Sequence, residues 1–189
     1  MLKKVFLIGG MSESGKSTVG KYLDSKGVKR LKIVTFLKRV MEAEGAFGDF
    51  VKWNEETEKQ RPDWLARRFV EEFERYCEEQ RICFCCLESL YRPNFAQSIR
   101  SAMPTKVAVV FVDIPQNLRV ERQMIRENLP SIEAAREYII PRDQRKEEWG
   151  THLVKDIADE IINNSGTVQD LYRKLDDMIK RHNISSVVS

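Results

Sequence analysis

The chain of 189 residues has no apolar run close to the about 20 residues that a transmembrane helix needs. It also lacks a secretory signal, because the basic and then apolar residues 3–8 are followed by Gly9, Gly10 and Glu13. The net charge is only +3, and basic residues are interspersed with acidic ones instead of forming a stripe that would track a nucleic-acid backbone. We expect a cytoplasmic protein without a membrane or nucleic-acid partner, and the sequence leaves its oligomeric state open.

Cysteine is scarce, and three of the four cysteines lie in one apolar run. Cys83, Cys85 and Cys86 are candidates for a metal site, but in a strand Cys83 and Cys85 would point to one face and Cys86 to the other. Neither histidine of the chain lies near them in the sequence. We interpret them as small apolar residues of a buried strand, whose reduced thiols fit a cytoplasmic protein.

Apolar runs alternate with charge-rich stretches of helical periodicity along the chain. The apolar runs predict strands at residues 3–8, 31–36, 81–87, 106–112 and 158–162. Helices are predicted at 17–25, 36–44, 64–80, 95–102, 116–127, 132–148 and 167–181, while 53–61 is polar with scattered aromatic residues. This alternation predicts a three-layer α/β fold with a mostly parallel sheet of about five strands, in one domain of residues 1–182. Residues 183–189 are predicted to be a frayed tail.

The strongest motif lies between the first predicted strand and the first predicted helix. Residues 10–17 match the Walker A pattern G-x-x-x-x-G-K-[ST]. Its glycines allow positive φ, so that successive main-chain N–H groups can hold a β-phosphate at the positive end of the helix. Lys16 would reach the β- and γ-phosphates, and the Ser17 hydroxyl would hold Mg²⁺. The motif predicts ATP or GTP with Mg²⁺, bound by Gly10, Met11, Ser12, Glu13, Ser14, Gly15, Lys16, Ser17 and Thr18.

Motifs of other nucleotide-binding classes are missing. The N/T-K-x-D segment of GTPases is absent, since Thr105-Lys106 is followed by Val107-Ala108, and so is the Ser-Gly-Gly signature of ABC-type ATPases. The length is too short for most motor or helicase cores. These absences favour a small-molecule kinase. A nucleotide-dependent ATPase or switch that regulates a protein partner and a binding module without catalysis remain alternatives.

The sequence resembles the nucleotide-kinase branch of P-loop proteins, and more narrowly dephospho-CoA kinases and archaeal adenylate-kinase-like proteins. Besides the Walker A loop, the resemblance rests on four segments. Residues 87–93 are similar to a D-G-x-R-P turn, and residues 112–115, Val-Asp-Ile-Pro, are followed by Arg119 and Arg122. The other two segments are 142–145, Arg-Asp-Gln-Arg, with Trp149 and Gly150, and 162–167, Ile-Asn-Asn-Ser-Gly-Thr. The resemblance covers most of the chain. It implies a P-loop NTPase fold with a helical lid at about 126–150, and transfer of a phosphoryl group from ATP to a nucleoside monophosphate or dephospho-CoA, with a kinase of another metabolite as the alternative.

The resemblance also implies roles for individual residues. The lid would clamp phosphates through Arg122, Arg142 and Arg145, unless these arginines form a salt-bridged surface with the interspersed glutamates. Asn164 and Gly166 would lie beside the ATP base, unless their loop is a plain helix start.

One acidic residue at the carboxyl edge of the sheet is expected to organise magnesium. Glu88 follows the third predicted strand, where it could hold a magnesium water or orient the acceptor. The resemblance implies Asp at this position, so Glu is a departure. Asp113 also follows an apolar strand and is the rival, although it could instead cap the next helix. We prefer Glu88.

The acceptor is expected at about residues 35–68, between the second strand and the long helix. Lys38, Arg39 and Arg92 are the predicted anchors of an anionic acceptor. The resembled kinases carry an acidic residue just after the second strand, where this chain has residues 35–39, Thr-Phe-Leu-Lys-Arg. This departure leaves the identity of the acceptor open.

Overall fold

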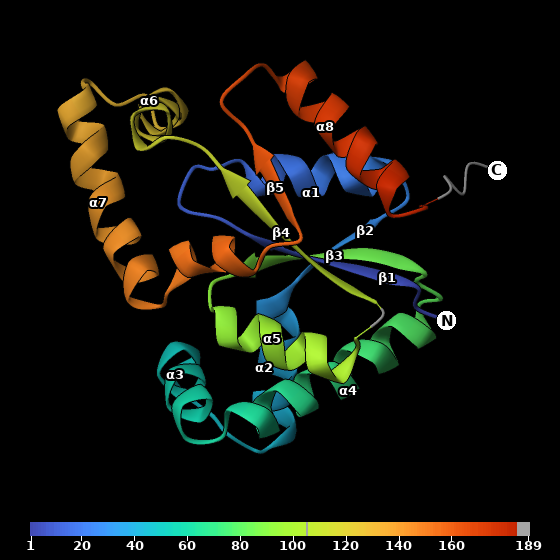
Figure 1. Cartoon of the computed structure of the whole chain (residues 1–189). Coiled ribbons are helices and arrows are strands. Elements are labelled where there is room, and N and C mark those ends of the chain that lie inside the picture. Colours follow the sequence, from blue (N-terminus) through green and yellow to red (C-terminus); the bar gives the residue numbers. More distant parts are fainter. Residues whose placement is uncertain (105, 185–189) are drawn as a thin grey trace.

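The computed structural model describes residues 1–104 and 106–184, and its centre is a sheet of five strands (Figure 1). The neighbouring strands are all parallel to one another. Their order in the sheet is β2-β3-β1-β4-β5, with β1 spanning Lys4–Gly9, β2 Lys29–Lys32, β3 Phe84–Leu90, β4 Val107–Asp113 and β5 Glu160–Asn163. The predicted α/β fold with a parallel sheet of about five strands is confirmed.

Helices cover both faces of this sheet (Figure 1). One face carries α1 (Lys16–Ser25) and α8 (Val168–Arg181), and the other carries α2 (Ile33–Ala43), α4 (Pro62–Glu79) and α5 (Pro93–Ala102). Along β1, Val5 and Leu7 belong to the core under α2, α4 and α5, while Phe6 and Ile8 belong to the core under α1 and α8. Burial of both faces explains why the strands are nearly continuous apolar runs.

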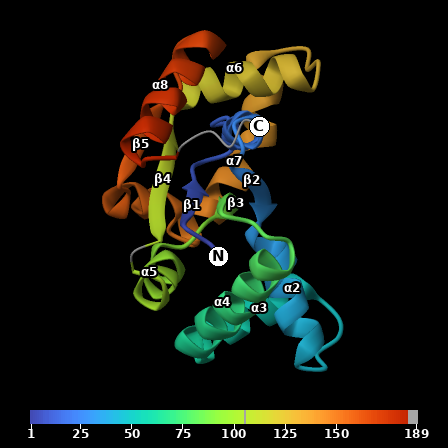
Figure 2. The ribbon, with the colours of Figure 1, turned by 90° about the vertical axis from the view of Figure 1, so that its right-hand side faces the viewer.

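Three further helices lie near the edge of the sheet where the strands end (Figure 1). The helices α6 (Gln116–Arg126) and α7 (Ile132–Glu148) pack on each other through a small core of their own, which includes Val120 and Ile139. Figure 2 shows α6 and α8 on one side of the sheet and α2, α3 (Phe50–Gln60) and α4 on the other. The 3-10 helix η1 (Thr151–Ile157) leads from α7 back to β5. The carboxyl edge is therefore enclosed from two sides.

The region of the second strand differs from its prediction. The predicted second strand is present, but its bounds of 31–36 are wrong, because β2 spans Lys29–Lys32 and α2 begins at Ile33. The helix forms because apolar residues recur here at steps of three and four and face the core, namely Ile33, Phe36, Leu37, Val40 and Met41.

The polar segment 53–61 belongs to α3, which received no prediction as a helix. Asp49 caps this helix, because its carboxylate accepts hydrogen bonds from the main-chain N–H groups of Val51 and Lys52. Thr57 is the only residue of α3 that is fully buried, so the helix shows little apolar periodicity in its sequence.

The strand β3 lies three residues farther along the chain than the predicted strand 81–87, so Glu88 lies within it and not after it. Cys85 and Cys86 are fully buried on opposite faces of β3. Within residues 1–104 and 106–184, no three His, Cys, Asp or Glu side chains form a group suited to a metal ion. Over the same ranges, no helix combines the length and apolarity needed to cross a membrane. Of the predicted tail, Ile184 is buried against the core under α1 and α8, and 185–189 lie outside the described residues.

Candidate active site

The Gly10–Ser17 loop joins β1 to α1 and requires glycine at two positions. Gly10 has a φ of 145° and Gly15 a φ of 96°, which other residues rarely adopt. A Cβ atom at Gly10 would lie 2.7 Å from the Val112 carbonyl oxygen, and one at Gly15 would lie 2.3 Å from Asn164 Nδ2. Gly15 is also the N-cap of α1 and provides no side-chain cap. The first turn of α1 therefore offers main-chain N–H groups at the positive end of the helix, an arrangement that can hold an anion.

Lys16 folds back over this loop. Its Nζ donates hydrogen bonds to the carbonyl oxygens of Gly10 and Met11, at 2.8 and 2.7 Å, and to Ser14 Oγ at 3.3 Å. Burial is the main cause that lowers the pKa of Lys16 to about 7; the nearby charge of Lys146 contributes to this shift and Glu13 opposes it. An anion in the loop would favour the charged form of this lysine.

A cavity of about 730 Å³ lies between the loop and α7. Two of the three predicted lid arginines, Arg142 and Arg145, line it, and so does Lys146. Its remaining walls are Ser12, Glu13, Ser14, Gly15, Lys16, Ser17, Thr18, Arg126, Pro141 and Trp149. The cavity thus combines the main-chain donors of the loop with four cationic side chains from α6 and α7 and with Lys16. This combination suits a polyphosphate.

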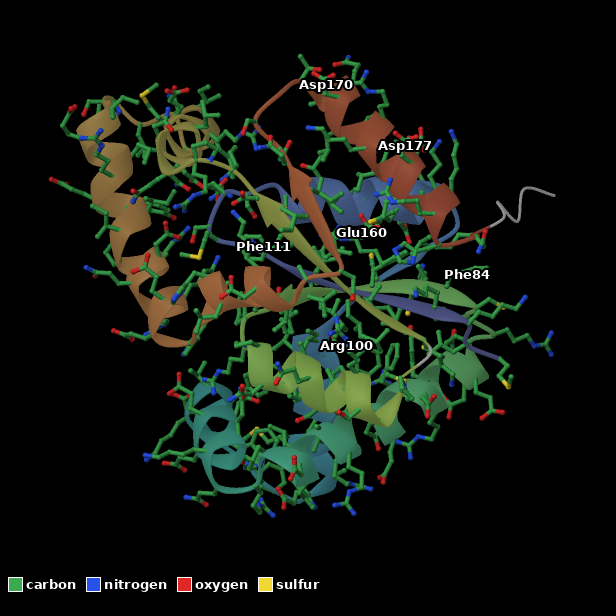
Figure 3. All side chains as sticks on the ribbon, in the orientation of Figure 1. Phe84, Arg100, Phe111, Glu160, Asp170 and Asp177 are labelled. Atoms are coloured by element: carbon green, nitrogen blue, oxygen red, sulfur yellow. The ribbon has the colours of Figure 1, made fainter. Side chains whose placement is uncertain are left out.

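The third predicted lid arginine has a different place. Arg122 Nη2 donates to the Asn164 carbonyl oxygen at 2.7 Å, and Asn164 Nδ2 donates to the Ser14 carbonyl oxygen at 2.8 Å. These bonds hold the segment after β5 against the loop. Gly166 precedes the capping box that Thr167 and Asp170 form at the start of α8. Figure 3 labels Asp170 at this end of the helix. Neither Asn164 nor Gly166 lines the cavity.

A buried ion pair connects the lid helices to the main chain of Ser12. Arg119 on α6 binds Asp143 on α7, and the two residues are only 6% and 4% exposed. The Ser12 N–H donates to Asp143 Oδ1 at 3.2 Å, and Arg119 Nη1 donates to the Ser12 carbonyl oxygen, also at 3.2 Å. The position of α7 over the loop is therefore set by this pair.

Lys146 is a second lysine that lines the cavity and has a lowered pKa. Burial lowers its pKa to about 8, Asp143 opposes this shift and Arg119 adds to it. Its Nζ lies 5.6 Å from the centroid of the Tyr91 ring. An anion in the cavity would raise the pKa of Lys16 and of Lys146 and so favour their charged forms.

Both candidate magnesium carboxylates are paired with cations. Glu88 is 4% exposed and accepts from Arg30 Nε at 2.7 Å and from Arg30 Nη2 at 2.9 Å. Asp113 accepts from Lys155 Nζ at 2.7 Å. Ser17 lines the cavity and fits the role of a metal ligand, whereas Glu88 and Asp113 would first have to exchange these partners. The role of Glu88 in organising magnesium therefore remains a prediction, and it requires Glu88 to exchange its partner Arg30.

A second pocket, of about 250 Å³, lies between α2, α3 and the end of β3, and Trp149 lines both it and the larger cavity. Of the three predicted acceptor anchors, Arg92 lines this pocket. Lys38 is exposed, and its Nζ lies 5.6 Å from the centroid of the Phe50 ring. Arg39 stacks on Tyr76 and faces a different depression beside Arg30. The structure therefore brings one of the three anchors to the pocket.

Comparisons with known proteins show the fold of the chain. No protein-family model and no curated protein sequence matches it. Solved structures match along almost the whole length: an uncharacterized protein from Eubacterium ventriosum has a TM-score of 0.60 at 15% identity, with coverage of 97% of this chain and 100% of that chain. A sugar kinase from Janibacter has a TM-score of 0.57 at 12% identity, with coverage of 99% and 98%. The chain has the P-loop kinase fold. TT1252 from Thermus thermophilus is similar too, with a TM-score of 0.58 at 21% identity and coverage of 96% and 98%.

The end of β3 has an irregular backbone. Ser89 has a φ of 73°, a conformation that glycine adopts easily and other residues rarely adopt. The pairing of β1 with β3 shifts at the same place, since Ile8 pairs with Glu88 and Gly9 with Leu90. Tyr91 and Arg92 follow this irregularity and line the second pocket.

Three residues of the candidate site were missed in the sequence. Asp143 and Lys146 lie within or beside the arginine-rich segment 142–145, whose cations alone received a role. Trp149 was noted only as part of the resemblance. For Lys146 and Trp149 the signal is helical spacing, because positions 142, 145, 146 and 149 follow one another at steps of three, one and three along α7 and its C-cap and line the same cavity. Asp143 lies outside this set, and no spacing in the sequence indicates its pairing with Arg119.

Proposed function

We propose that the protein transfers the γ-phosphoryl group of ATP to a small-molecule acceptor. The observation that carries this proposal is that Trp149 lines two cavities, one walled by the Gly10–Ser17 loop and cations of α6 and α7 and the other by α2, α3 and the end of β3. A phosphoryl donor in the first and a hydroxyl compound in the second would place their reacting ends at the same junction. Transfer in a P-loop kinase depends mainly on such positioning and on stabilisation of charge.

The residues of the larger cavity divide this work. Main-chain N–H groups at the start of α1 would hold the β-phosphate, and Lys16 would leave the Gly10 and Met11 carbonyl oxygens to bind the β- and γ-phosphates. Arg142, Arg145 and Lys146 would stabilise the charge on the transferred group. Magnesium, when bound at the Ser17 hydroxyl, would neutralise part of the phosphate charge.

Glu88 and the segment after β5 have proposed roles although neither lines the larger cavity. Glu88 would reach a magnesium water only after a change in its pairing with Arg30. The segment that contains Asn164 and Gly166 would lie beside the adenine base, held there by the hydrogen bonds of Asn164 to Arg122 and Ser14. The adenine would then contact main chain, and the donor would be ATP.

The test is an ADP-release assay with a panel of nucleosides, nucleoside monophosphates, dephospho-CoA and other small alcohols. We expect slow ADP release with ATP alone and a large acceleration by one class of acceptor. Lys16→Ala should abolish the accelerated rate. Equal rates with and without every acceptor, in both proteins, would contradict the proposal, and a rate that depends on a protein partner would indicate a nucleotide-dependent switch instead.

A further inference from the structure

The second pocket lies where the acceptor of the proposed reaction would bind, and its chemistry restricts that acceptor. Its walls are mainly apolar and aromatic, and include Ile33, Leu37, Phe50, Tyr91 and Trp149. The volume of about 250 Å³ is below the 300–1,000 Å³ typical of pockets for drug-sized ligands. A compact molecule fits this space, whereas the long chain of dephospho-CoA would have to extend outside it.

The positive charge in this pocket is already neutralised. Arg92 is the one cationic residue among the described residues that line it. Arg92 Nη1 lies 2.6 Å from Glu58 Oε2, and Arg92 Nη2 lies 4.0 Å from Glu55 Oε1. Glu55 Oε1 also accepts the indole N–H of Trp149 at 3.0 Å. One guanidinium between two carboxylates leaves no excess positive charge for a phosphate or carboxylate on the acceptor.

The burial of Glu58 strengthens this argument. Its side chain is 13% exposed, and burial raises its pKa while the charge of Arg92 opposes the shift. An acceptor phosphate at Arg92 would have to replace Glu58 and leave this buried carboxylate without its partner, which is unfavourable. The cations that suit phosphate, Arg145 and Lys146, lie instead on the side of the larger cavity.

One polar group of the pocket has no hydrogen-bond partner among residues 1–104 and 106–184. Asn54 lines the pocket, and its Oδ1 is buried without a hydrogen bond among the residues that the structure describes. A buried carbonyl oxygen without a partner is unfavourable, and a ligand N–H or O–H group could satisfy it. Asn54 and Glu55 therefore provide hydrogen-bond acceptors in a pocket whose other walls are mainly apolar.

We propose that the acceptor is a compact, phosphate-free hydroxyl compound with an apolar or aromatic body and at least one N–H or O–H group that donates to Asn54. This inference rests on the proposed function for its reaction, and on the geometry of the second pocket for its ligand. It replaces the nucleoside monophosphates and dephospho-CoA suggested by the sequence with neutral or cationic alcohols. In the reaction, the hydroxyl oxygen forms the bond to the γ-phosphorus, the bond to the β,γ-bridging oxygen breaks, ADP leaves, and the hydroxyl proton goes to solvent.

The test uses matched pairs of an alcohol and its phosphate ester, namely uridine with UMP and pyridoxine with pyridoxine 5′-phosphate. Binding to the full chain is followed by tryptophan fluorescence without ATP, and Trp149→Phe identifies the contribution of Trp149. We expect the alcohol of at least one pair to bind about tenfold more tightly than its ester. Asn54→Leu should weaken binding of that alcohol by a similar factor.

Charge variants test the reason for the preference. Glu58→Gln should release Arg92 and reduce the preference for the alcohol by about tenfold, whereas the control Glu56→Gln, on the same helix and outside the pocket, should not change it. Tighter or equal binding of the esters by the unmodified protein would overturn the inference. Failure of every alcohol to bind, or an unchanged preference in Glu58→Gln, would do so as well.

The two proposals fail separately. If alcohols bind preferentially but no phosphoryl transfer occurs with any compound, the proposed reaction is wrong and the assignment of the pocket stands. If UMP or dephospho-CoA is phosphorylated at a higher rate than any phosphate-free alcohol, the reaction is right and the assignment of the pocket is wrong.

Discussion

Arg30 binds both carboxylate oxygens of Glu88, at 2.7 and 2.9 Å, although 58 positions separate the two residues in the chain. Parallel pairing of β2 with β3 brings them together on the face covered by α1, where a Cβ atom at Gly20 would lie 1.9 Å from Glu88 Oε1. The carboxylate is buried, so its stability depends on this arginine. The pair connects the edge strand to the centre of the sheet.

Replacement of the arginine should therefore destabilise the fold. Arg30→Met leaves Glu88 buried without a partner, and we expect the free energy of unfolding to fall by about 2–4 kcal/mol, measured by urea denaturation. The double variant Arg30→Met/Glu88→Gln should recover most of this loss, because no buried charge remains. Equal stability of the single and double variants would show that the pair does not have this role.

Affinity for ATP should depend on pH through Lys16. The pKa of this lysine is about 7 in the free protein, and a bound triphosphate would raise it, so binding above pH 7 takes up a proton. Affinity should then fall by up to about tenfold per pH unit between pH 7 and 9, and should level off below pH 7, where the lysine is already charged. Calorimetry in buffers of different ionisation enthalpy measures the proton uptake directly.

Two variants separate the lysines in this pH dependence. Lys146 has a pKa of about 8 and adds to proton uptake, so Lys146→Met should remove its share and leave that of Lys16. Lys16→Arg keeps its charge throughout this range and should remove most of the remaining dependence. Unchanged proton uptake in both variants would mean that other groups titrate on binding.

The lid arginines should act on the rate of transfer. Arg142→Ala and Arg145→Ala each remove a cation from the cavity wall, and we expect kcat to fall by about 10²–10³ with a smaller change in KM for ATP. Arg136→Ala is the matched control, because Arg136 is exposed on the same helix and does not line the cavity. A loss in Arg136→Ala as large as in the other two would indicate a general effect of charge on α7.

The buried pair of Arg119 and Asp143 should hold α7 against the loop. Asp143→Asn leaves Arg119 without its counter-charge, and we expect a loss of about 2–4 kcal/mol in stability, with faster hydrogen exchange in α7 and at Ser12. Glu137→Gln removes an exposed carboxylate from the same helix and should change neither quantity. Normal exchange at Ser12 in Asp143→Asn would contradict this role.

The sheet and the Gly10–Ser17 loop between β1 and α1 were predictable because their signals are local. The run at 106–112 is apolar and rich in β-branched residues, and the loop pattern lies between a strand and a helix, as phosphate binding requires. Prediction was weaker at the second strand and α3. There, Ile33–Met41 shows both an apolar run and helical spacing, and α3 buries too little of its surface to leave a pattern.

In the candidate site, the sequence predicted individual residues that belong to a motif, but not the pairs that these residues form. Arg142, Arg145 and Ser17, which were named from motifs, line the larger cavity, and Arg92 lines the second pocket. The partners of Glu88, Asp143 and Arg92 come from distant segments, and no spacing in the sequence reveals a pair that depends on strand order or on the packing of α7. Those pairings decide which charges are available to a ligand.

The central claim is that this chain moves the γ-phosphoryl group of ATP to a hydroxyl compound at the junction marked by Trp149. The most direct measurement is ³¹P NMR of ATP and Mg²⁺ incubated with the protein and the phosphate-free alcohols that it binds. The account predicts a new phosphate-ester resonance that grows as the γ-phosphate signal declines, and its absence with Lys16→Ala. Release of inorganic phosphate alone, or an unchanged ATP spectrum with every alcohol, would contradict it.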